Sequence, residues 1–286
     1  MTISINMDNN VTFMYICGMS MTRSLLYGTA WKEERTQELV RSALAAGFRG
    51  IDTANQRKHY FEAAVGAGIS AAGIPRAELF LQTKFTYVRG QDSRLPYERG
   101  APIATQVQQS FESSCEHLGT PTIDSYVLHG PWSNFGWQTQ DREAWAAMEA
   151  LHGEGRARCL GVSNVSLEQL GALLAGAAVA PAYVQNRCYA RGGWDREVRA
   201  LCRERGIVYQ GFSLLTANTR ELASPRVAAI ARRLNASVAQ VVFRFAIAVG
   251  MLPLTGTTSR THMEEDLAAP GLALEEADIA VLSNLG

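Results

Sequence analysis

Four side chains suited to acid–base chemistry lie at or just beyond the ends of short apolar runs. Asp52 follows GFRGI, Tyr60 lies beyond the same run, Lys84 ends ELFLQTK and His129 ends IDSYVLH. When hydride reduces a carbonyl group, the oxygen develops negative charge and needs a proton donor with positive charge nearby. Tyr60 could donate that proton if the Lys84 ammonium lowered the tyrosine pKa from about 10. Asp52 would keep Lys84 charged and fixed, and His129 would hydrogen-bond the substrate oxygen.

Each of these residues alone has a simpler explanation. Asp52 could cap a helix or form an ion pair, Tyr60 could be a packed aromatic, Lys84 a solvated strand end and His129 a structural histidine. Their shared position after strand-like runs favours the catalytic hypothesis, because the C-terminal ends of the strands of a parallel barrel converge on one face.

Eight short β-rich runs alternate with amphipathic segments. The expected strands are 24–28, 50–54, 79–84, 124–129, 158–164, 183–186, 208–213 and 251–256. Apolar residues three and four positions apart predict helices at 34–47, 61–73, 103–119, 142–155, 166–177, 195–206, 224–236 and 237–250. Strict alternation predicts a parallel sheet with right-handed crossovers, and eight units predict closure. An open doubly wound sheet is the alternative, but YGTAWKEER after the first run lacks the GxGxxG turn of that fold.

We therefore expect an α/β protein, a (β/α)8 TIM barrel that forms one domain over residues 1–286. An N-terminal β-hairpin is expected within 11–24, and the chain ends in a short C-terminal tail, LEEADIAVLSNLG. Ser166 and Ser237 are expected to cap helix N-termini.

Composition favours a small-molecule partner. The chain carries 27 basic and 27 acidic residues, which gives no overall field for nucleic acid or an anionic membrane. No apolar run reaches the roughly 20 residues that span a bilayer, and the N-terminus lacks the features of a secretory signal, so a cytoplasmic location is expected. The five cysteines are scattered without CxxC spacing, which predicts reduced thiols and no metal site.

The motifs that carry these residues resemble the aldo-keto reductase family over nearly the whole chain. GFRGIDTA, LFLQTK, IDSYVLHGP and LGVSN resemble the family's second to fifth strands, and EAAVGAGI resembles the helix after the second, all in family order and at family spacing. This resemblance implies a barrel that binds a nicotinamide cofactor in extended form, with Asp52, Tyr60, Lys84 and His129 as the catalytic residues.

The same resemblance implies the cofactor and substrate sites. Ser163, Asn164 and Gln185 would hold the nicotinamide carboxamide, and their alternative is strand-end capping. The other residues implied for the cofactor are Gly28, Thr29, Phe212, Ser213, Leu215, Gly256, Thr257, Arg260, His262, Glu265 and Asp266. Trp31 and Trp132 would form the walls of an apolar substrate pocket, or else pack in the core.

The chain departs from the family pattern at several positions. Tyr60 follows Asp52 by eight positions, whereas the family tyrosine follows by five, where Arg57 stands here. We interpret QRKHYFE as a short insertion, since extra loop residues cost little closure entropy. Phe212 replaces the family's stacking tyrosine. The usual lysine and arginine that bind a 2′-phosphate are absent, and Arg260 with a helix opening near Thr261 is expected to substitute. NADPH is therefore preferred, with NADH as the alternative.

These observations predict an NADPH-dependent carbonyl reductase, which in reverse would oxidise an alcohol. Substrate choice would depend on the loops 86–102 and 130–140. One alternative is a nicotinamide-binding barrel of low turnover with a regulatory or redox-sensing role. Another is a barrel isomerase or hydrolase, which would need paired carboxylates or metal ligands at the strand ends. A monomer is expected, with a homodimer as the alternative.

Overall fold

The structure is a computed structural model that describes residues 14–16, 19–21 and 24–286. Eight parallel strands close into a barrel in the order β10-β3-β4-β5-β6-β7-β8-β9. All eight overlap the predicted runs, and four of them extend one residue beyond the predicted bounds: β3 Leu26–Gly28, β4 Gly50–Asp52, β5 Phe80–Phe85, β6 Ile123–Leu128, β7 Ala157–Ser163, β8 Tyr183–Arg187, β9 Val208–Phe212 and β10 Met251–Thr255. The predicted (β/α)8 fold is thus confirmed.

Eight of the helices overlap the segments that the apolar spacing predicted, whereas the helices at 219–222 and 276–283 were not predicted. The helices are α1 Thr36–Ala46, α2 Glu62–Ala72, α3 Ile103–Leu118, α4 Thr139–Gly153, α5 Leu167–Gly176, α6 Arg196–Glu204, α7 Thr219–Leu222, α8 Pro225–Arg233, α9 Val238–Ala248, α10 Arg260–Ala268 and α11 Glu276–Ser283. The 3-10 turns are η1 Glu33–Arg35, η2 Arg76–Glu78, η3 Val88–Gly90, η4 Ala190–Gly192 and η5 Ala269–Gly271. Both predicted caps are confirmed: Ser166 Oγ accepts from Gln169 N and Ser237 Oγ from Gln240 N, each at 3.2 Å.

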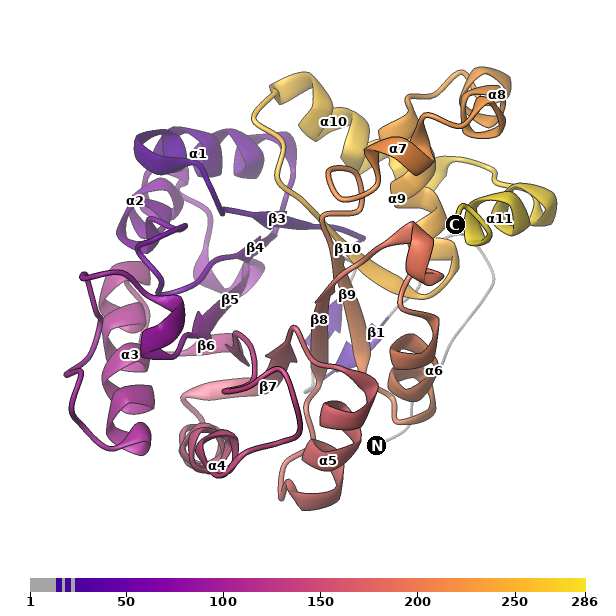
Figure 1. The fold of residues 1–286 in the computed structure, drawn as a ribbon. Helices are drawn as coiled ribbons and strands as arrows, with labels where there is room; N and C mark the ends of the chain where they lie inside the picture. The colour runs from indigo at the N-terminus through magenta and orange to yellow at the C-terminus, as the bar shows by residue number, and fades with distance from the viewer. Residues whose placement is uncertain (1–13, 17–18, 22–23) are drawn as a thin grey trace. The chain divides into compact units, whose positions relative to one another are not determined.

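The described chain divides into two compact units, of which the first is Tyr27–Val184. In it, helices α1 to α4 lie outside strands β4 to β7 (Figure 1). The parallel register sets Gly28 opposite Asp52, and Asp52 opposite Gln82. Because successive side chains of a strand point to opposite faces, Gln82 and Lys84 share one face of β5 and Thr83 points to the other. This alternation separates the two polar clusters described below.

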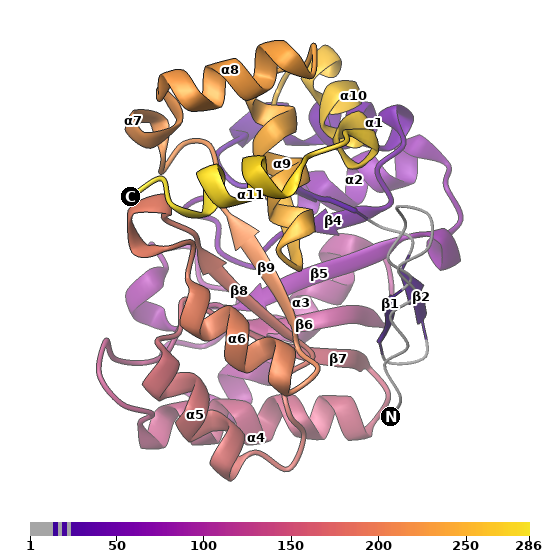
Figure 2. The ribbon, with the colours of Figure 1, turned by 90° about the vertical axis from the view of Figure 1, so that its right-hand side faces the viewer.

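The second unit consists of Gln185–Gly286 with the described residues up to Leu26. Strands β9 and β10 pair with Met251 opposite Tyr209. Helix α11 packs against α8 and α9 (Figure 2). The Arg233 guanidinium joins α8 to the start of α11 through ion pairs with Glu275, at 3.0 Å, and Asp278.

Short strands β1 (Met14–Ile16) and β2 (Met19–Met21) pair antiparallel, as the predicted hairpin requires, and the rest of the 11–24 prediction lies partly outside the described residues. Cys159 is disulfide-bonded, so the prediction of five reduced thiols was wrong there. Cys115, Cys188 and Cys202 are free. In the described part of the chain, no helix has the length and apolar character needed to cross a membrane.

Candidate functional site

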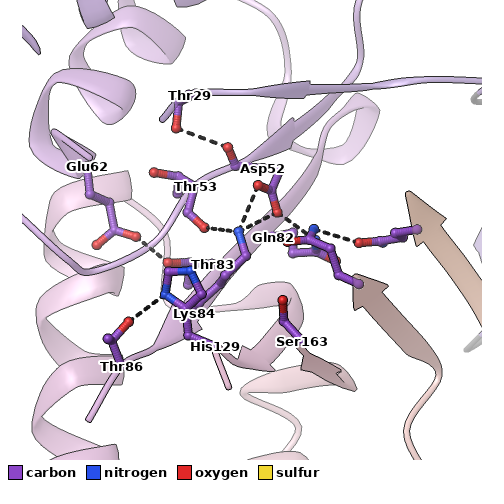
Figure 3. Close-up of polar contacts among 12 residues, drawn as sticks. Thr29, Asp52, Thr53, Glu62, Gln82, Thr83, Lys84, Thr86, His129 and Ser163 are labelled. Carbon is purple, nitrogen blue, oxygen red and sulfur yellow. Dashed lines mark hydrogen bonds and ion pairs between the residues drawn. The ribbon is translucent and has the colours of Figure 1, made fainter. Parts of the chain in front are cut away.

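A buried ion pair joins the ends of β4 and β5. Lys84 Nζ donates to both carboxylate oxygens of Asp52, at 2.7 Å each, and to the Thr53 carbonyl at 2.8 Å (Figure 3). Gln82 Nε2 donates to Asp52 Oδ1 at 2.7 Å. The side chains of Lys84 and Asp52 are 0% and 4% exposed, so water screens the pair little. All three ammonium protons of Lys84 are therefore engaged, and the lysine is held in one geometry.

Burial has a clear effect on the charge of Lys84. It lowers the lysine pKa below its usual value, because a buried ammonium loses its hydration, while the carboxylates of Asp52 and Glu62 oppose this change. The pairing that sequence reasoning expected between Asp52 and Lys84 is therefore present, and it is what favours the charged form.

His129 follows β6 and lies beside this pair. Its Nδ1 lies 2.7 Å from the Thr86 Oγ1 (Figure 3). Its backbone is fixed on both sides, since its N–H donates to the Phe85 carbonyl and its carbonyl accepts from Asn164 Nδ2. Burial, and next the Lys84 charge, lower the pKa of His129 to about 3. The imidazole is therefore neutral at physiological pH and can donate a hydrogen bond from only one nitrogen.

Tyr60 lies in the loop before α2, and its ring reaches the same cluster. Lys84 Nζ lies over the Tyr60 ring, 5.4 Å from its centroid, and the His129 ring meets it edge-on at 5.9 Å. Within the described residues, the Tyr60 phenol forms no hydrogen bond, so Lys84 approaches the tyrosine ring without donating to its hydroxyl. Burial, and next the Asp52 charge, raise the pKa of Tyr60 well above its usual value. The catalytic role of Tyr60 stays a prediction.

The loop that precedes Tyr60 is held to neighbouring segments by side-chain hydrogen bonds. Gln56 Nε2 donates to the Gly90 carbonyl at 2.6 Å, and Asn55 Nδ2 to the Ser110 carbonyl at 3.0 Å. Gln91 Nε2 returns a bond to the Asn55 carbonyl at 2.8 Å. These side chains are buried, so the loop that carries Tyr60 is tied to α3 and to the segment after β5.

A second buried cluster lies on the opposite face of β5 from the ion pair, and the sequence did not predict it. The Glu62 carboxylate accepts from Thr83 Oγ1, from Ser114 Oγ at 2.9 Å and from His117 Nδ1 at 3.1 Å. Helices α2 and α3 approach closely at Gly66, where a Cβ would lie 1.8 Å from the His117 carbonyl oxygen. The hydrogen bond to Glu62 raises the pKa of His117. The signal in the sequence was the acidic residue that opens α2, together with Ser114 and His117 three positions apart on α3.

Several residues implied for the cofactor lie in the same unit, at the strand ends that carry His129 and Asp52. Thr29 follows β3, is 0% exposed and donates to the Asp52 carbonyl at 3.0 Å. Ser163 ends β7 and is 0% exposed. Asn164 has a left-handed backbone, φ 55°, and its Nδ2 also contacts Ser163 Oγ at 3.1 Å. Unusual backbone of this kind in a non-glycine residue is common at functional sites.

The other implied cofactor residues belong to Gln185–Gly286. Gln185 Nε2 donates to Gln210 Oε1 at 2.9 Å, and the Arg187 guanidinium lies 5.6 Å from the centre of the Phe212 ring. Ser213 has φ 56°. Helix α10 begins at Arg260, as expected near Thr261, and Ser259 Oγ accepts from His262 N.

One basic and one acidic side chain of this segment, Arg260 and Asp266, already have partners. Arg260 Nε contacts Glu264 Oε1 at 2.6 Å on the exposed face of α10. Asp266 is buried and accepts from Thr255 Oγ1 at 2.6 Å, and burial raises its pKa to about 6. The cofactor roles of these residues, and those of Leu215, Gly256, Thr257 and Glu265, stay predictions.

The two tryptophans expected at the substrate pocket differ in their surroundings. Trp31 is 68% exposed, has φ 60°, and lies over the His59 ring with centroids 4.0 Å apart. Trp132 is half-buried and meets the Tyr87 ring edge-on at 5.1 Å. The Tyr87 phenol donates to the Gln140 carbonyl and to Asp141, both at 3.1 Å. Trp31 is thus the more accessible of the two.

Within the described residues, no group of His, Cys, Asp and Glu side chains could hold a metal ion. What the arrangement offers is a buried positive charge, a neutral imidazole and a protonated phenol, all near the ends of β4 to β6. Such a set suits stabilisation of a developing oxyanion with proton transfer.

Comparison with known proteins gives a consistent result. The model of the Aldo/keto reductase family matches residues 18–285. An NAD/NADP-dependent indole-3-acetaldehyde reductase of Schizosaccharomyces pombe is 28% identical, covering 86% of this chain and 82% of that protein. Morphine 6-dehydrogenase of Pseudomonas putida is 29% identical, over 88% and 83%. The crystal structure of an aldo/keto reductase from Brucella melitensis has a TM-score of 0.81 with 27% identity, covering 96% of this chain and all (100%) of that one.

Proposed function

The chain belongs to the aldo-keto reductase family, whose members are NAD(P)H-dependent oxidoreductases acting on carbonyl groups, and from this premise we propose that it reduces an aldehyde or ketone with Tyr60 as the proton donor. The observation that carries the proposal is the buried Lys84–Asp52 pair with the rings of Tyr60 and His129 beside it. When bound, the nicotinamide cofactor supplies the hydride.

The proton transfer depends on the charge state of three groups. The raised pKa of Tyr60 keeps the phenol protonated at working pH, so it has a proton to give. As that proton leaves, negative charge develops close to the Lys84 ammonium, which is fixed by Asp52 and needs no reorientation to stabilise it. Neutral His129 would donate a hydrogen bond to the substrate oxygen and so hold the carbonyl in place.

The donors and acceptors near His129 fit a nicotinamide carboxamide. A carboxamide presents one acceptor and an NH2 donor. The Asn164 side chain is exposed, and its Oδ1 accepts no hydrogen bond from the described residues, so it can take the carboxamide NH2. We assign the remaining carboxamide contacts to Ser163 and Gln185, and ring stacking to Phe212. A readout independent of turnover is the affinity for oxidised cofactor, which Asn164→Ala should weaken.

For the coenzyme we propose NADPH, with Arg260 at the start of α10 as the group that contacts the 2′-phosphate. Arg260 already contacts Glu264, so phosphate binding would exchange one anionic partner for another. Arg260→Ala should reduce the preference for NADPH over NADH, and Arg205→Ala is the control, since Arg205 is an exposed arginine paired with Glu204. Equal preference in wild type and Arg260→Ala would remove Arg260 from the site.

For the substrate we propose a carbonyl compound with an aromatic or other flat apolar part. Trp31 is the accessible aromatic at the end of β3, and its ring is held by His59. Flat rings stack on indole with favourable electrostatics as well as apolar burial.

The decisive experiment is turnover of NADPH with a panel of aromatic and aliphatic aldehydes, comparing Tyr60→Phe with Tyr87→Phe. Tyr87 is buried and its phenol is engaged by Asp141, so Tyr87→Phe should stay active if it folds. Tyr60→Phe should lose most of its turnover while it still binds cofactor. Loss of turnover in Tyr87→Phe alone would contradict the assignment of the acid.

One observation favours a second candidate, a nicotinamide-binding barrel of low turnover with a regulatory or redox-sensing role. All three Lys84 protons go to Asp52 and Thr53, and none goes to the Tyr60 phenol. Without a direct donor the phenol is a weaker acid than the reductase proposal requires. Tight cofactor binding with no turnover across the aldehyde panel would favour this candidate.

A further inference from the structure

Within the described residues, the His129 side chain forms one hydrogen bond, and its partner is Thr86. The two atoms, Thr86 Oγ1 and His129 Nδ1, are 2.7 Å apart, and Thr86 is 6% exposed (Figure 3). We propose that Thr86 is a positioning residue that fixes the tautomer of His129, so that the imidazole carries its proton on Nε2 and presents it to the substrate oxygen. This inference rests on the proposed carbonyl reduction for its role, but its tautomer can be measured without substrate.

The direction of the hydrogen bond follows from the partners available to each atom. A threonine hydroxyl has one proton, and a neutral imidazole has one N–H and one acceptor nitrogen. Within the described residues, Thr86 Oγ1 contacts no acceptor other than Nδ1, so its proton stays bonded only if the hydroxyl donates. The opposite tautomer would leave a buried hydroxyl proton without a partner, which is unfavourable. Nδ1 is then the acceptor and Nε2 carries the hydrogen.

The surroundings of Thr86 keep the hydroxyl in this position. The Thr86 carbonyl accepts from the Tyr97 phenol at 2.6 Å and from Gln91 Nε2 at 3.3 Å. On the other side the Thr86 methyl group faces Gly90, where a Cβ would lie 2.7 Å from Cγ2. A residue larger than glycine there would push the threonine side chain away, so the backbone and the rotamer of Thr86 are both constrained.

The protonation state of His129 makes the tautomer matter. An imidazolium would carry a proton on both nitrogens, and Thr86 could not then select one. Burial and the Lys84 charge keep the ring neutral through the physiological range. With a single N–H to offer, His129 can act as a donor to a carbonyl oxygen only in the Nε2–H form, because Nδ1 is occupied by Thr86.

The test uses the whole 286-residue chain, three threonine variants and a histidine variant for signal assignment. Thr86→Ser keeps the hydroxyl, Thr86→Val keeps the shape and removes it, and Thr36→Val removes another buried threonine hydrogen bond, the one from Thr36 Oγ1 to the Glu33 carbonyl. Two-bond ¹H–¹⁵N spectra of the imidazoles report the tautomer, and the His129 signals are identified by their loss in His129→Gln, since the chain has five histidines.

We expect the Nε2–H tautomer in the wild type and in Thr86→Ser, and a changed Nδ1 shift in Thr86→Val. In turnover, Thr86→Val should lose about three- to tenfold in kcat, the effect of one hydrogen bond, whereas Thr86→Ser and Thr36→Val should stay close to wild type. An Nδ1–H tautomer in the wild type would overturn the proposal, even if Thr86→Val failed to fold. So would a Thr86→Ser variant as impaired as Thr86→Val. If the wild type reduced no carbonyl but showed the Nε2–H form, the proposed function would fail and the tautomer assignment would stand.

Discussion

The buried pair of Asp52 and Lys84 gives a prediction whose size can be worked out. Asp52→Asn keeps the shape of the side chain but removes the charge that balances the ammonium, and it turns one acceptor oxygen into an NH2 group facing Nζ. Removal of one partner from a buried ion pair costs about 3–5 kcal/mol of unfolding free energy. An independent upper bound on this loss of unfolding free energy agrees with that figure, because Lys84 can avoid the penalty of an unpaired buried charge by losing its proton.

That bound follows from the lysine pKa. With an unfolded pKa of about 10.4, deprotonation at about pH 7 costs roughly 1.4 kcal/mol for each of about 3.4 pH units, or about 5 kcal/mol. If the folded variant holds Lys84 neutral, the unfolded state binds one more proton than the folded state. The stability of Asp52→Asn should then rise with pH by about 1.4 kcal/mol per unit, so the deficit relative to the wild type shrinks as the pH is raised toward about 9.

The measurement is urea unfolding followed by tryptophan fluorescence, for the wild type, Asp52→Asn, Lys84→Met and the double variant at two pH values. Because the double variant buries no charge in the pair, it should lose at least about 2 kcal/mol less than the sum of the two single losses. Asp92→Asn is the control: that carboxylate forms an exposed ion pair with Arg94, and its loss should change stability little. Additive losses, or a deficit for Asp52→Asn that does not depend on pH, would refute the picture of a tightly coupled buried pair.

Three further predictions concern single groups. The pKa of His129 is about 3 in the folded state, below its ordinary value of 6.5, so on acidification the unfolded state takes up a proton first. Between about pH 6.5 and about pH 5 the wild type should therefore lose about 2 kcal/mol of unfolding free energy that His129→Gln does not lose. Parallel pH dependence of the two proteins in urea unfolding would contradict this. Glu62→Gln should bring the raised pKa of His117 back toward its usual value in an NMR titration, and an unchanged pKa would mean that the Glu62 contact does not exist in solution. Trp31→Ala should raise KM for aromatic aldehydes about two- to tenfold with little change in stability. Leu167→Ala, which truncates an apolar side chain that is 40% exposed, should leave KM unaltered, and equal effects of both would argue against Trp31 as a substrate contact.

The hydrogen bonds of the site are mostly beyond sequence reasoning. Nothing in the order of residues indicates that Lys84 directs all its protons to Asp52 and Thr53, or that the Tyr60 phenol is left without a partner among the described residues. Those outcomes depend on ångström-scale approaches between segments that are up to 32 positions apart in the chain. Thr86 and Glu62 were missed for the same reason, since a hydroxyl and a carboxylate become functional candidates only once their neighbours are known.

The amino-acid sequence by itself determined the eight strands, the helices after them and the placement of Asp52, Lys84 and His129 at strand ends. These follow from local rules, because the alternation of apolar runs with amphipathic segments specifies each element and a parallel barrel brings the strand ends together. Tertiary structure decided how the loop of Tyr60 is tied down, which groups share protons and which nitrogen of His129 faces Thr86. Those features depend on side-chain packing and burial, which act over distances in space that the linear order of residues does not record.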